Sequence, residues 1–461
     1  MTVWGYTLNS WLRSKHPINL QFSIILLLSG ALTVSAQQNN RSNNADALWE
    51  VFLSSKVALS DRIPLHYTGI HSADSISYAA QDTLDRVLVR DLTLCRLFNL
   101  RLPNLAPDTS RSNPFSDRTT YLDGQFDADS SFRVIMSLRA KPGAPPFWTS
   151  AYTFAEERAR AAAHRVSADV IRQLTGEPTV MQTRIAYCGQ IGRIKEIFSV
   201  TFDGFDRICH TRQNVSLLSP AWSPDGKKIA YTTFLEDQAD IYILDLDSGT
   251  YQPFWNGPGV DQAPDWSPDG QWIAFSSSMD GNAEIYIRRV DGSELKRLTY
   301  SWAIETSPDW SPTGRQIAFT SDRLGRPQVF IMDVDGANER RLTTEGEYND
   351  TPAWSPRGDL IAYVRRDIDG FQIYVTDPQG EKHVKLTTGP GDNMDPVWSP
   401  DGLKLAFTSN RTGRKQIYTM DLFGRQVDRI SDYYMSCSNP TWSPIMDNSD
   451  DISVTPQTMN N

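Results

Sequence analysis

Six tryptophans recur at a fixed interval of 44 residues, and this spacing constrains the fold more than any other feature of the chain. They are Trp222, Trp266, Trp310, Trp354, Trp398 and Trp442. Each is followed by Ser-Pro, and most of these pairs continue as Asp-Gly or a close variant. A period of this length, with an aromatic residue and a turn in every unit, is typical of β-propeller blades. The sequence therefore predicts a mainly β fold with a propeller over residues 181–445.

Each repeat contains the pattern of four short strands. In the unit 304–343 the second and third strands are predicted at 316–320 and 328–332, where apolar residues cluster between turn residues. Pro312 and Gly314 mark the tight turn after the tryptophan, because proline presets φ and glycine tolerates the left-handed region. A single blade cannot bury both of its faces, so neighbouring blades must stack. The repeat tryptophan is expected to fill the gap between them.

The number of blades follows from the two ends of the repeat region. No second strand follows Trp442, but three unmatched strand patterns precede Trp222, at 184–187, 195–200 and 207–211. The last strand is therefore expected to join these three in one mixed blade, which closes a ring of six blades. Ring closure removes the exposed sheet edges that favour aggregation.

The first residues have the character of an export signal. Phe22 to Val34 form an apolar run, and Val34-Ser35-Ala36 offers small residues for cleavage after Ala36. The run is shorter than the roughly 20 residues that a membrane-spanning helix requires. We expect residues 1–36 to be a cleaved signal peptide and the mature protein not to insert into a membrane; an uncleaved anchor is the alternative.

Residues 37–180 carry no repeat and predict a small α/β domain after a flexible, polar start. Apolar residues keep helical spacing over 80–95 and over 155–174. Thr153 and Glu156 predict a capping box at the start of the second helix, and Gly176 and Pro178 predict its end. Strands are predicted at 131–138 and 121–126. Residues 446–461 are interpreted as a polar tail.

Composition excludes several classes of function. The formal net charge of −10 argues against a general nucleic-acid binder. The 4 cysteines form no Cys-x-x-Cys pair, which argues against a zinc or thioredoxin-type site. Cys188 and Cys209 fall on strands two and four of one blade, which are not neighbours. Free thiols are expected, and a disulfide between these two residues is the alternative.

The chain lacks the common catalytic motifs. It contains no Gly-x-Ser-x-Gly, no His-Glu-x-x-His and no glycine-rich loop with lysine for phosphate. His164 lies beside the apolar face of the second predicted helix, where a structural hydrogen bond is expected. We therefore predict no catalytic residue, no cofactor and no enzymatic activity. The alternative of a peptidase fragment, capped by its propeller, would require a further hydrolase domain.

The loops before the tryptophans are the candidate functional region. In a propeller the innermost strand of each blade starts at the mouth of the central channel. Four acidic residues precede the tryptophans and could form a ring there: Asp261, Glu305, Asp350 and Asp395. We interpret this region as a rim for docking a partner. A calcium site is one alternative, because hard cations favour oxygen ligands, and a solvated rim of turn-forming residues is another.

The junction between the two parts resembles the TolB family of the Tol-Pal system. The resemblance rests on residues 163–176, Ala-His-Arg-Val-Ser-Ala-Asp-Val-Ile-Arg-Gln-Leu-Thr-Gly, followed by Thr-Arg-Ile-Ala-Tyr at 183–187. Residues 84–92 resemble an earlier helix of that family, and the likeness covers about residues 75–445. It implies a non-catalytic, monomeric, two-domain protein of the periplasm. This protein would bind the lipoprotein Pal through its propeller and TolA through its N-terminal region.

The resemblance also implies where the partners bind and what the complex does. Pal would dock on the channel-mouth loops, at the positions three and four residues before a tryptophan: Gln262, Ala263, Thr306, Ser307, Asp350, Thr351, Met394 and Asp395. TolA would use a segment such as 48–53. The system would support outer-membrane integrity and constriction at cell division. The alternative function is a propeller that senses a small ligand or sugar in its channel.

Overall fold

The computed structural model describes residues 63–72, 79–95, 97–102, 119–128, 131–235, 238–446 and 452–456. All of these belong to one compact unit of the chain, residues 52–461. The predicted signal peptide 1–36, its cleavage after Ala36 and the candidate TolA segment 48–53 lie outside the described residues. None of the helices within the described ranges is long and apolar enough to cross a bilayer.

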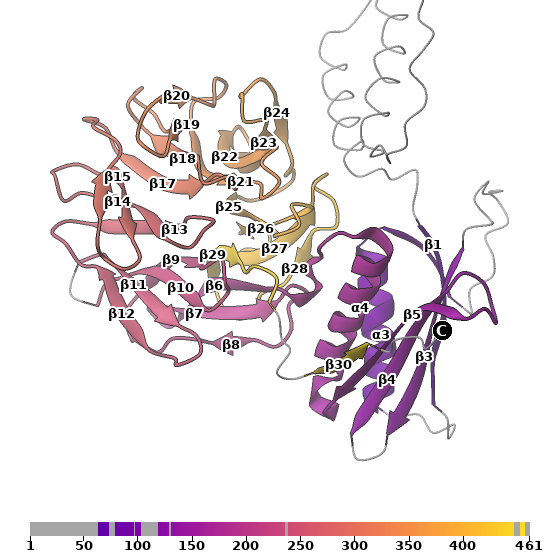
Figure 1. The fold of residues 1–461 in the computed structure, drawn as a ribbon. Coiled ribbons are helices and arrows are strands. Elements are labelled where there is room, and N and C mark those ends of the chain that lie inside the picture. The colour runs from indigo at the N-terminus through magenta and orange to yellow at the C-terminus, as the bar shows by residue number, and fades with distance from the viewer. Residues whose placement is uncertain are drawn as a thin grey trace, which may run out of the picture. The chain divides into compact units, whose positions relative to one another are not determined.

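The α/β part is a mixed sheet with two helices packed side by side against it (Figure 1). The strand order is β2-β1-β3-β4-β5-β30. The strands are β1 (Ile63–Ser72), β2 (Phe98–Arg101), β3 (Thr120–Ala128), β4 (Phe132–Arg139), β5 (Pro146–Phe154) and β30 (Ser453–Pro456). The helices are α3 (Ala79–Leu94) and α4 (Ala159–Thr175), with the short 3-10 turns η3 (Glu156–Arg158) and η4 (Val180–Gln182) beside α4.

The start of the second helix differs from the prediction. Thr153 lies inside β5, opposite Arg133 of β4, and α4 begins only after the turn η3. The predicted capping box of Thr153 and Glu156 is therefore wrong, because the sheet extends Thr153 into the ladder. The C-terminal signal is confirmed: Gly176 has a φ of 72° and donates its N–H to the carbonyl of Arg172 at 2.8 Å.

The remaining strands form six four-stranded antiparallel sheets that are the blades of a propeller (Figure 1). Blade 1 closes the ring and combines β29 (Cys437–Trp442) with β6 (Arg184–Ile191), β7 (Ile194–Thr201) and β8 (Ile208–Cys209). The predicted mixed blade is thus confirmed, with Trp442 opposite Ile185.

Blades 2 to 6 follow one another in the chain, and in each the first strand is the innermost. Blade 2 contains β9 (Leu217–Trp222), β10 (Lys228–Thr233), β11 (Asp240–Asp245) and β12 (Tyr251–Trp255). Blade 3 contains β13 (Asp261–Trp266), β14 (Trp272–Ser277), β15 (Glu284–Arg289) and β16 (Leu295–Arg297). Blade 4 contains β17 (Glu305–Trp310), β18 (Gln316–Ser321), β19 (Gln328–Asp333) and β20 (Arg340–Arg341). Blade 5 contains β21 (Asn349–Trp354), β22 (Ile361–Asp367), β23 (Gly370–Thr376) and β24 (His383–Lys385). Blade 6 contains β25 (Asn393–Trp398), β26 (Lys404–Ser409), β27 (Gln416–Asp421) and β28 (Asp428–Arg429).

Each repeat tryptophan is the last residue of an innermost strand and packs against the blade before it. All six are buried, with exposed fractions of 5–9%. Trp266 of blade 3 belongs to a core cluster with Ile241 and Phe254 of blade 2. Its indole Nε1 also donates to the carbonyl of Ala221 in blade 2 at 3.2 Å. The predicted packing of tryptophans between blades is therefore confirmed.

A buried polar cluster joins α3 and α4 to the turn after β7. His164 of α4 approaches Asp91 of α3 with its Nδ1 at 2.7 Å and Asp203 of blade 1 with its Nε2 at 3.5 Å. Arg160 also pairs with Asp203. Burial acts to raise the pKa of Asp203, but the nearby His164, Thr201 and Arg160 outweigh it and hold that pKa below its usual value. His164 thus has the structural role that its helical position predicts.

All four cysteines are free thiols. Cys188 and Cys437 are buried on adjoining strands of blade 1, and burial raises the pKa of Cys188 to about 12. The predicted disulfide alternative between Cys188 and Cys209 does not form.

The buried tryptophans should dominate the stability of the propeller. Trp398→Ala is expected to lower the free energy of unfolding by about 3–5 kcal/mol, because the change leaves a cavity between blades 5 and 6. Trp302→Ala is the matched control, since Trp302 is 81% exposed and should change that energy by less than about 0.5 kcal/mol. Urea unfolding followed by far-ultraviolet circular dichroism measures both. Equal stability of the two variants would contradict the packing described here.

Candidate functional site

The innermost strands enclose a central channel that every blade builds in the same way. Its cavity of about 170 Å³ is lined by three consecutive residues from each innermost strand, and the middle residue is always proline. The lining triplets are Ser219-Pro220-Ala221, Ala263-Pro264-Asp265, Ser307-Pro308-Asp309, Thr351-Pro352-Ala353, Asp395-Pro396-Val397 and Asn439-Pro440-Thr441. The channel is therefore a sixfold product of the repeat.

The first residue of each triplet adopts a left-handed backbone although none of them is glycine. The φ values lie between 47° and 55° for Ser219, Ala263, Ser307, Thr351, Asp395 and Asn439. The pairing with the second strand shifts register at the same place in all six blades, which marks a β-bulge. Non-glycine residues in this conformation and bulges of this kind concentrate at functional sites.

Hydrogen bonds between blades hold these bulges in place. The backbone N–H of Ala263 donates to the hydroxyl of Thr232 in the preceding blade at 3.2 Å. In the same way, the backbone N–H of Thr351 in blade 5 donates to the hydroxyl of Thr320 in blade 4 at 3.2 Å. The wall of the channel is thus fixed by contacts across the seams between blades.

Three carboxylates face the channel. Asp265 accepts a hydrogen bond from the backbone N–H of Trp310 at 2.8 Å, and Asp309 accepts one from Trp354 at 2.6 Å. Asp395 accepts a bond from the hydroxyl of Thr408 at 2.9 Å. Burial raises the pKa of Asp265 to about 7, and burial with the neighbouring charge of Asp265 raises the pKa of Asp309 well above its usual range. Asp395 also has a pKa raised by burial.

Sequence reasoning did not select Asp265 and Asp309. The available signal was the tripeptide Pro-Asp-Trp in two successive repeats, where the other repeats carry alanine, valine or threonine before the tryptophan. An acidic residue on the wall of so narrow a channel is unusual, because a largely buried carboxylate needs hydrogen-bond donors or a proton. Both residues obtain the donors from the next blade.

The structure places all eight predicted docking residues around the channel. Ala263, Ser307, Thr351 and Asp395 line its wall, and Gln262, Thr306, Asp350 and Met394 precede them on the same strands. All eight side chains are half-buried. These positions are therefore brought together, although whether a partner binds them remains a proposal.

The four predicted calcium ligands are not brought together. Asp261 and Glu305 are the first residues of their strands and are fully buried, and the Oε1 of Glu305 lies 3.0 Å from Arg323 of its own blade. Asp350 accepts a bond from Tyr348 at 3.1 Å. Within the described ranges no group of three or more His, Cys, Asp or Glu residues could hold a metal ion. The acidic ring does not form: Glu305 pairs with Arg323, Asp350 bonds to Tyr348, and Asp261 is buried at the start of β13. Of the four, Asp395 lines the channel.

Exposed apolar side chains surround the end of the channel at which the innermost strands begin. In each blade the first strand runs away from this end and the second returns to it. The loops between strands two and three, and between strand four and the next blade, therefore lie at this end. Exposed apolar residues in these loops, with Ile191 at the end of β6, are Phe234, Leu235, Val260, Tyr300, Trp302, Ile304, Leu324, Ile368, Tyr433 and Tyr434. We call these residues the apolar rim. Apolar surface gathered in this way is typical of an interaction site.

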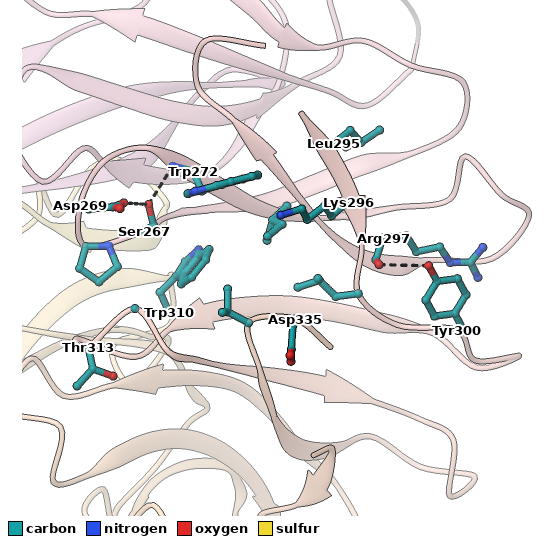
Figure 2. Close-up of a pocket in the computed structure, with 15 residues that line it drawn as sticks. Ser267, Asp269, Trp272, Leu295, Lys296, Arg297, Tyr300, Trp310, Thr313 and Asp335 are labelled. Carbon is teal, nitrogen blue, oxygen red and sulfur yellow. Dashed lines mark hydrogen bonds between the residues drawn. The ribbon is translucent and has the colours of Figure 1, made fainter. Parts of the chain in front are cut away.

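A larger groove lies between blades 3 and 4, away from the channel. Its volume is about 790 Å³, and Figure 2 shows Trp272, Lys296 and Trp310 around it. Lys296 occupies the position at which Arg340 of the next blade donates to the carbonyl of Pro378 and bridges the following seam. Lys296 instead pairs with Glu294 at 2.9 Å and lies 4.8 Å from the centre of the Trp272 ring. Lys296 therefore leaves this seam without the bridge that Arg340 makes at the next one.

The channel mouth is the stronger candidate because all six blades contribute to it. It combines left-handed residues, shielded carboxylates and the apolar rim, whereas the groove depends on the local side chains of two blades. The groove has the larger volume, but volume alone does not identify a binding site.

The comparisons with known proteins agree on one family. A family profile described as "TolB beta propeller domain" matches residues 171–373 and 366–458. The Tol-Pal system protein TolB of Methylococcus capsulatus is 36% identical over 114 residues, which cover 24% of this chain and 27% of that protein. The TolB of Escherichia fergusonii is 31% identical over 186 residues, which cover 37% of this chain and 43% of that protein. The chain thus spans less than half the length of these curated relatives.

A solved structure extends the similarity to the α/β part. The crystal structure of TolB from Acinetobacter baumannii matches with a TM-score of 0.69 and 26% sequence identity. The match covers 83% of this chain and 97% of that chain. The arrangement of a small α/β part before a six-bladed propeller is therefore shared.

The raised pKa of Asp265 predicts a pH dependence of stability. The folded pKa of about 7 lies above the ordinary value of about 3.9, so proton binding stabilises the fold fully below about pH 4. This contribution is lost as the pH rises from about 4 to about 7. Asp265→Asn cannot ionise, so its unfolding free energy relative to the unmodified protein should increase over this range. The change should not exceed about 1.4 kcal/mol per pH unit.

Urea unfolding at several pH values between 5 and 8 measures this difference. Asp247→Asn is the control, because Asp247 is exposed in a turn. A constant difference between Asp265→Asn and the unmodified protein across these pH values would show that Asp265 does not titrate there.

Proposed function

The chain belongs to the TolB β-propeller family of the Tol-Pal system, and on that premise we propose that it is a non-catalytic, monomeric protein-interaction component of the periplasm. Its propeller would dock the lipoprotein Pal at the channel mouth, and its N-terminal region would contact TolA. In this role the protein would support outer-membrane integrity and constriction at cell division.

One observation carries the proposal for Pal. The apolar rim surrounds the opening around which the eight predicted docking positions gather. The side chains of Tyr300, Trp302 and Tyr434 are 77%, 81% and 85% exposed, although large aromatic side chains are usually buried in folded proteins. Exposed tyrosine and tryptophan at the centre of a contact are the side chains that contribute most to binding energy in protein complexes. The rim therefore offers aromatic anchors, and the half-buried residues inside it offer polar contacts.

The rigidity of the mouth supports the same role. The left-handed residues are fixed by hydrogen bonds between blades, as Ala263 and Thr351 illustrate. A surface that is already ordered loses little conformational freedom when a partner binds, which favours affinity. The proposed contact with TolA rests on the family alone, since segment 48–53 lies outside the described residues.

A second candidate function is a sensor for a small ligand or sugar. The groove of Figure 2 favours it, because the indole of Trp272 and the ammonium of Lys296 border a hollow of about 790 Å³. Aromatic rings of this kind pack against the apolar faces of sugars. Isothermal titration calorimetry with candidate sugars separates the two functions, since the sensor requires heat of binding that Trp272→Ala abolishes.

Pal docking makes a prediction for the rim. Trp302→Ala is expected to weaken binding to lipid-free Pal of the same organism about tenfold or more, because it removes an exposed aromatic anchor. Asp350→Lys should also weaken binding, since Asp350 precedes the channel wall and lies inside the rim. Tyr251→Ala is the control: Tyr251 is 46% exposed but lies on β12, an outermost strand.

Isothermal titration calorimetry with folded protein measures these affinities. Absence of binding at tens of micromolar would argue against Pal as the partner. Binding that Tyr251→Ala weakens and Trp302→Ala leaves unchanged would place the partner on another face of the propeller.

A further inference from the structure

The tail predicted to be merely polar contains the last strand of the α/β sheet. Strand β30 pairs antiparallel with β5, with Ser453 opposite Thr153 and Val454 opposite Tyr152. On its other side β5 pairs with β4, so β30 occupies the edge of the sheet. Without this strand, the backbone N–H and C=O groups along one side of β5 would face water, and an edge of this kind is a template for pairing with another chain.

The tail strand is anchored by two apolar side chains on one face. Ile452 is 4% exposed and belongs to the core cluster of the α/β part, and Val454 packs against that cluster. Ser453 and Thr455 are exposed. Alternate residues of a strand point to opposite faces, so Ile452 and Val454 share the face toward the core and Ser453 and Thr455 share the other.

The strand is short enough to exchange. Within the described part of the tail, its pairing with β5 spans Ser453 to Pro456, with Ile452 buried and Val454 partly buried against the core. The free energy gained from that burial is opposed by the entropy lost when the residues are ordered. We therefore expect this pairing to be weak enough for a competing strand to replace it.

The fold keeps the tail close to this site. The N–H of Met446 donates to the carbonyl of Gln182 at 2.9 Å, directly after the propeller has closed. Only residues 447–451 separate Met446 from Ile452. A short tether raises the effective concentration of a segment to the order of millimolar. The tail can thus cover the site although its own affinity is weak.

We propose that the edge of β5 is a strand-acceptor site for an extended protein segment with apolar residues at alternate positions, and that the tail occupies this site as a displaceable cover. The site lies in the α/β part and is independent of the channel mouth. A partner strand that displaces the tail would add to the same sheet through backbone hydrogen bonds, and its two apolar side chains would take the places of Ile452 and Val454.

The proposal is tested with the full chain and a synthetic peptide of residues 449–458. In the open variant, Ile452→Asp with Val454→Asp, the tail can no longer bury its anchors and should leave β5. The fluorescently labelled peptide should then bind the open variant, with an affinity at least about tenfold higher than for the unmodified chain. Ser453→Ala with Thr455→Ala is the matched control, because it changes the two exposed positions and should keep the site covered.

Fluorescence anisotropy measures the binding, and a peptide with aspartate at the two apolar positions should not bind. Equal affinity for the unmodified chain and the open variant would overturn the proposal, as would no binding to a folded open variant at about 1 mM peptide. If the double change prevents folding, Val454→Asp alone replaces it, because Val454 is only partly buried.

Discussion

The packing of one indole ring between each pair of neighbouring blades is the interaction on which the rest of the structure depends. Each ring ends an innermost strand and contacts the blade before it, as Trp266 contacts Ile241 and Phe254. The same strands form the wall of the channel. The indoles therefore fix the spacing of the blades and, through it, the positions of the bulged residues at the channel mouth. A loss of packing at one seam would disturb the wall as well as the stability of the fold.

The fold was predictable because its causes are periodic. The tryptophan spacing predicted the six blades, and the unmatched strands before Trp222 predicted the mixed closing blade, both of which are confirmed. Similar reasoning placed the helix that ends at Gly176, where a left-handed glycine is required. The docking positions could be selected as places in the repeat, and the structure gathers them at one opening. Their role in binding stays a prediction.

The features that escaped prediction are those that depend on contacts distant in sequence. Thr153 matches a capping box locally, yet pairing with its neighbouring strands extends it into β5. The strand around Val454 is too short to show the alternation of apolar and polar residues that predicts a strand. It is ordered by pairing with the edge of β5. The calcium hypothesis placed Asp261 and Asp395 in one ring, but Asp261 is fully buried at the start of β13, whereas Asp395 lines the channel. The role of Asp265 could not be predicted, because its hydrogen-bond donor, the backbone N–H of Trp310, comes from the next blade.

We expect a partner to bind at the end of the propeller where the innermost strands begin. Hydrogen–deuterium exchange of the full chain, with and without lipid-free Pal, tests that claim most directly because it reports on every blade at once. Pal should slow exchange in the loops that carry the apolar rim, foremost 299–304 and 430–436, and leave the Ser-Pro turns after the tryptophans unchanged. Protection confined to those Ser-Pro turns, with the rim loops exchanging as before, would contradict the account.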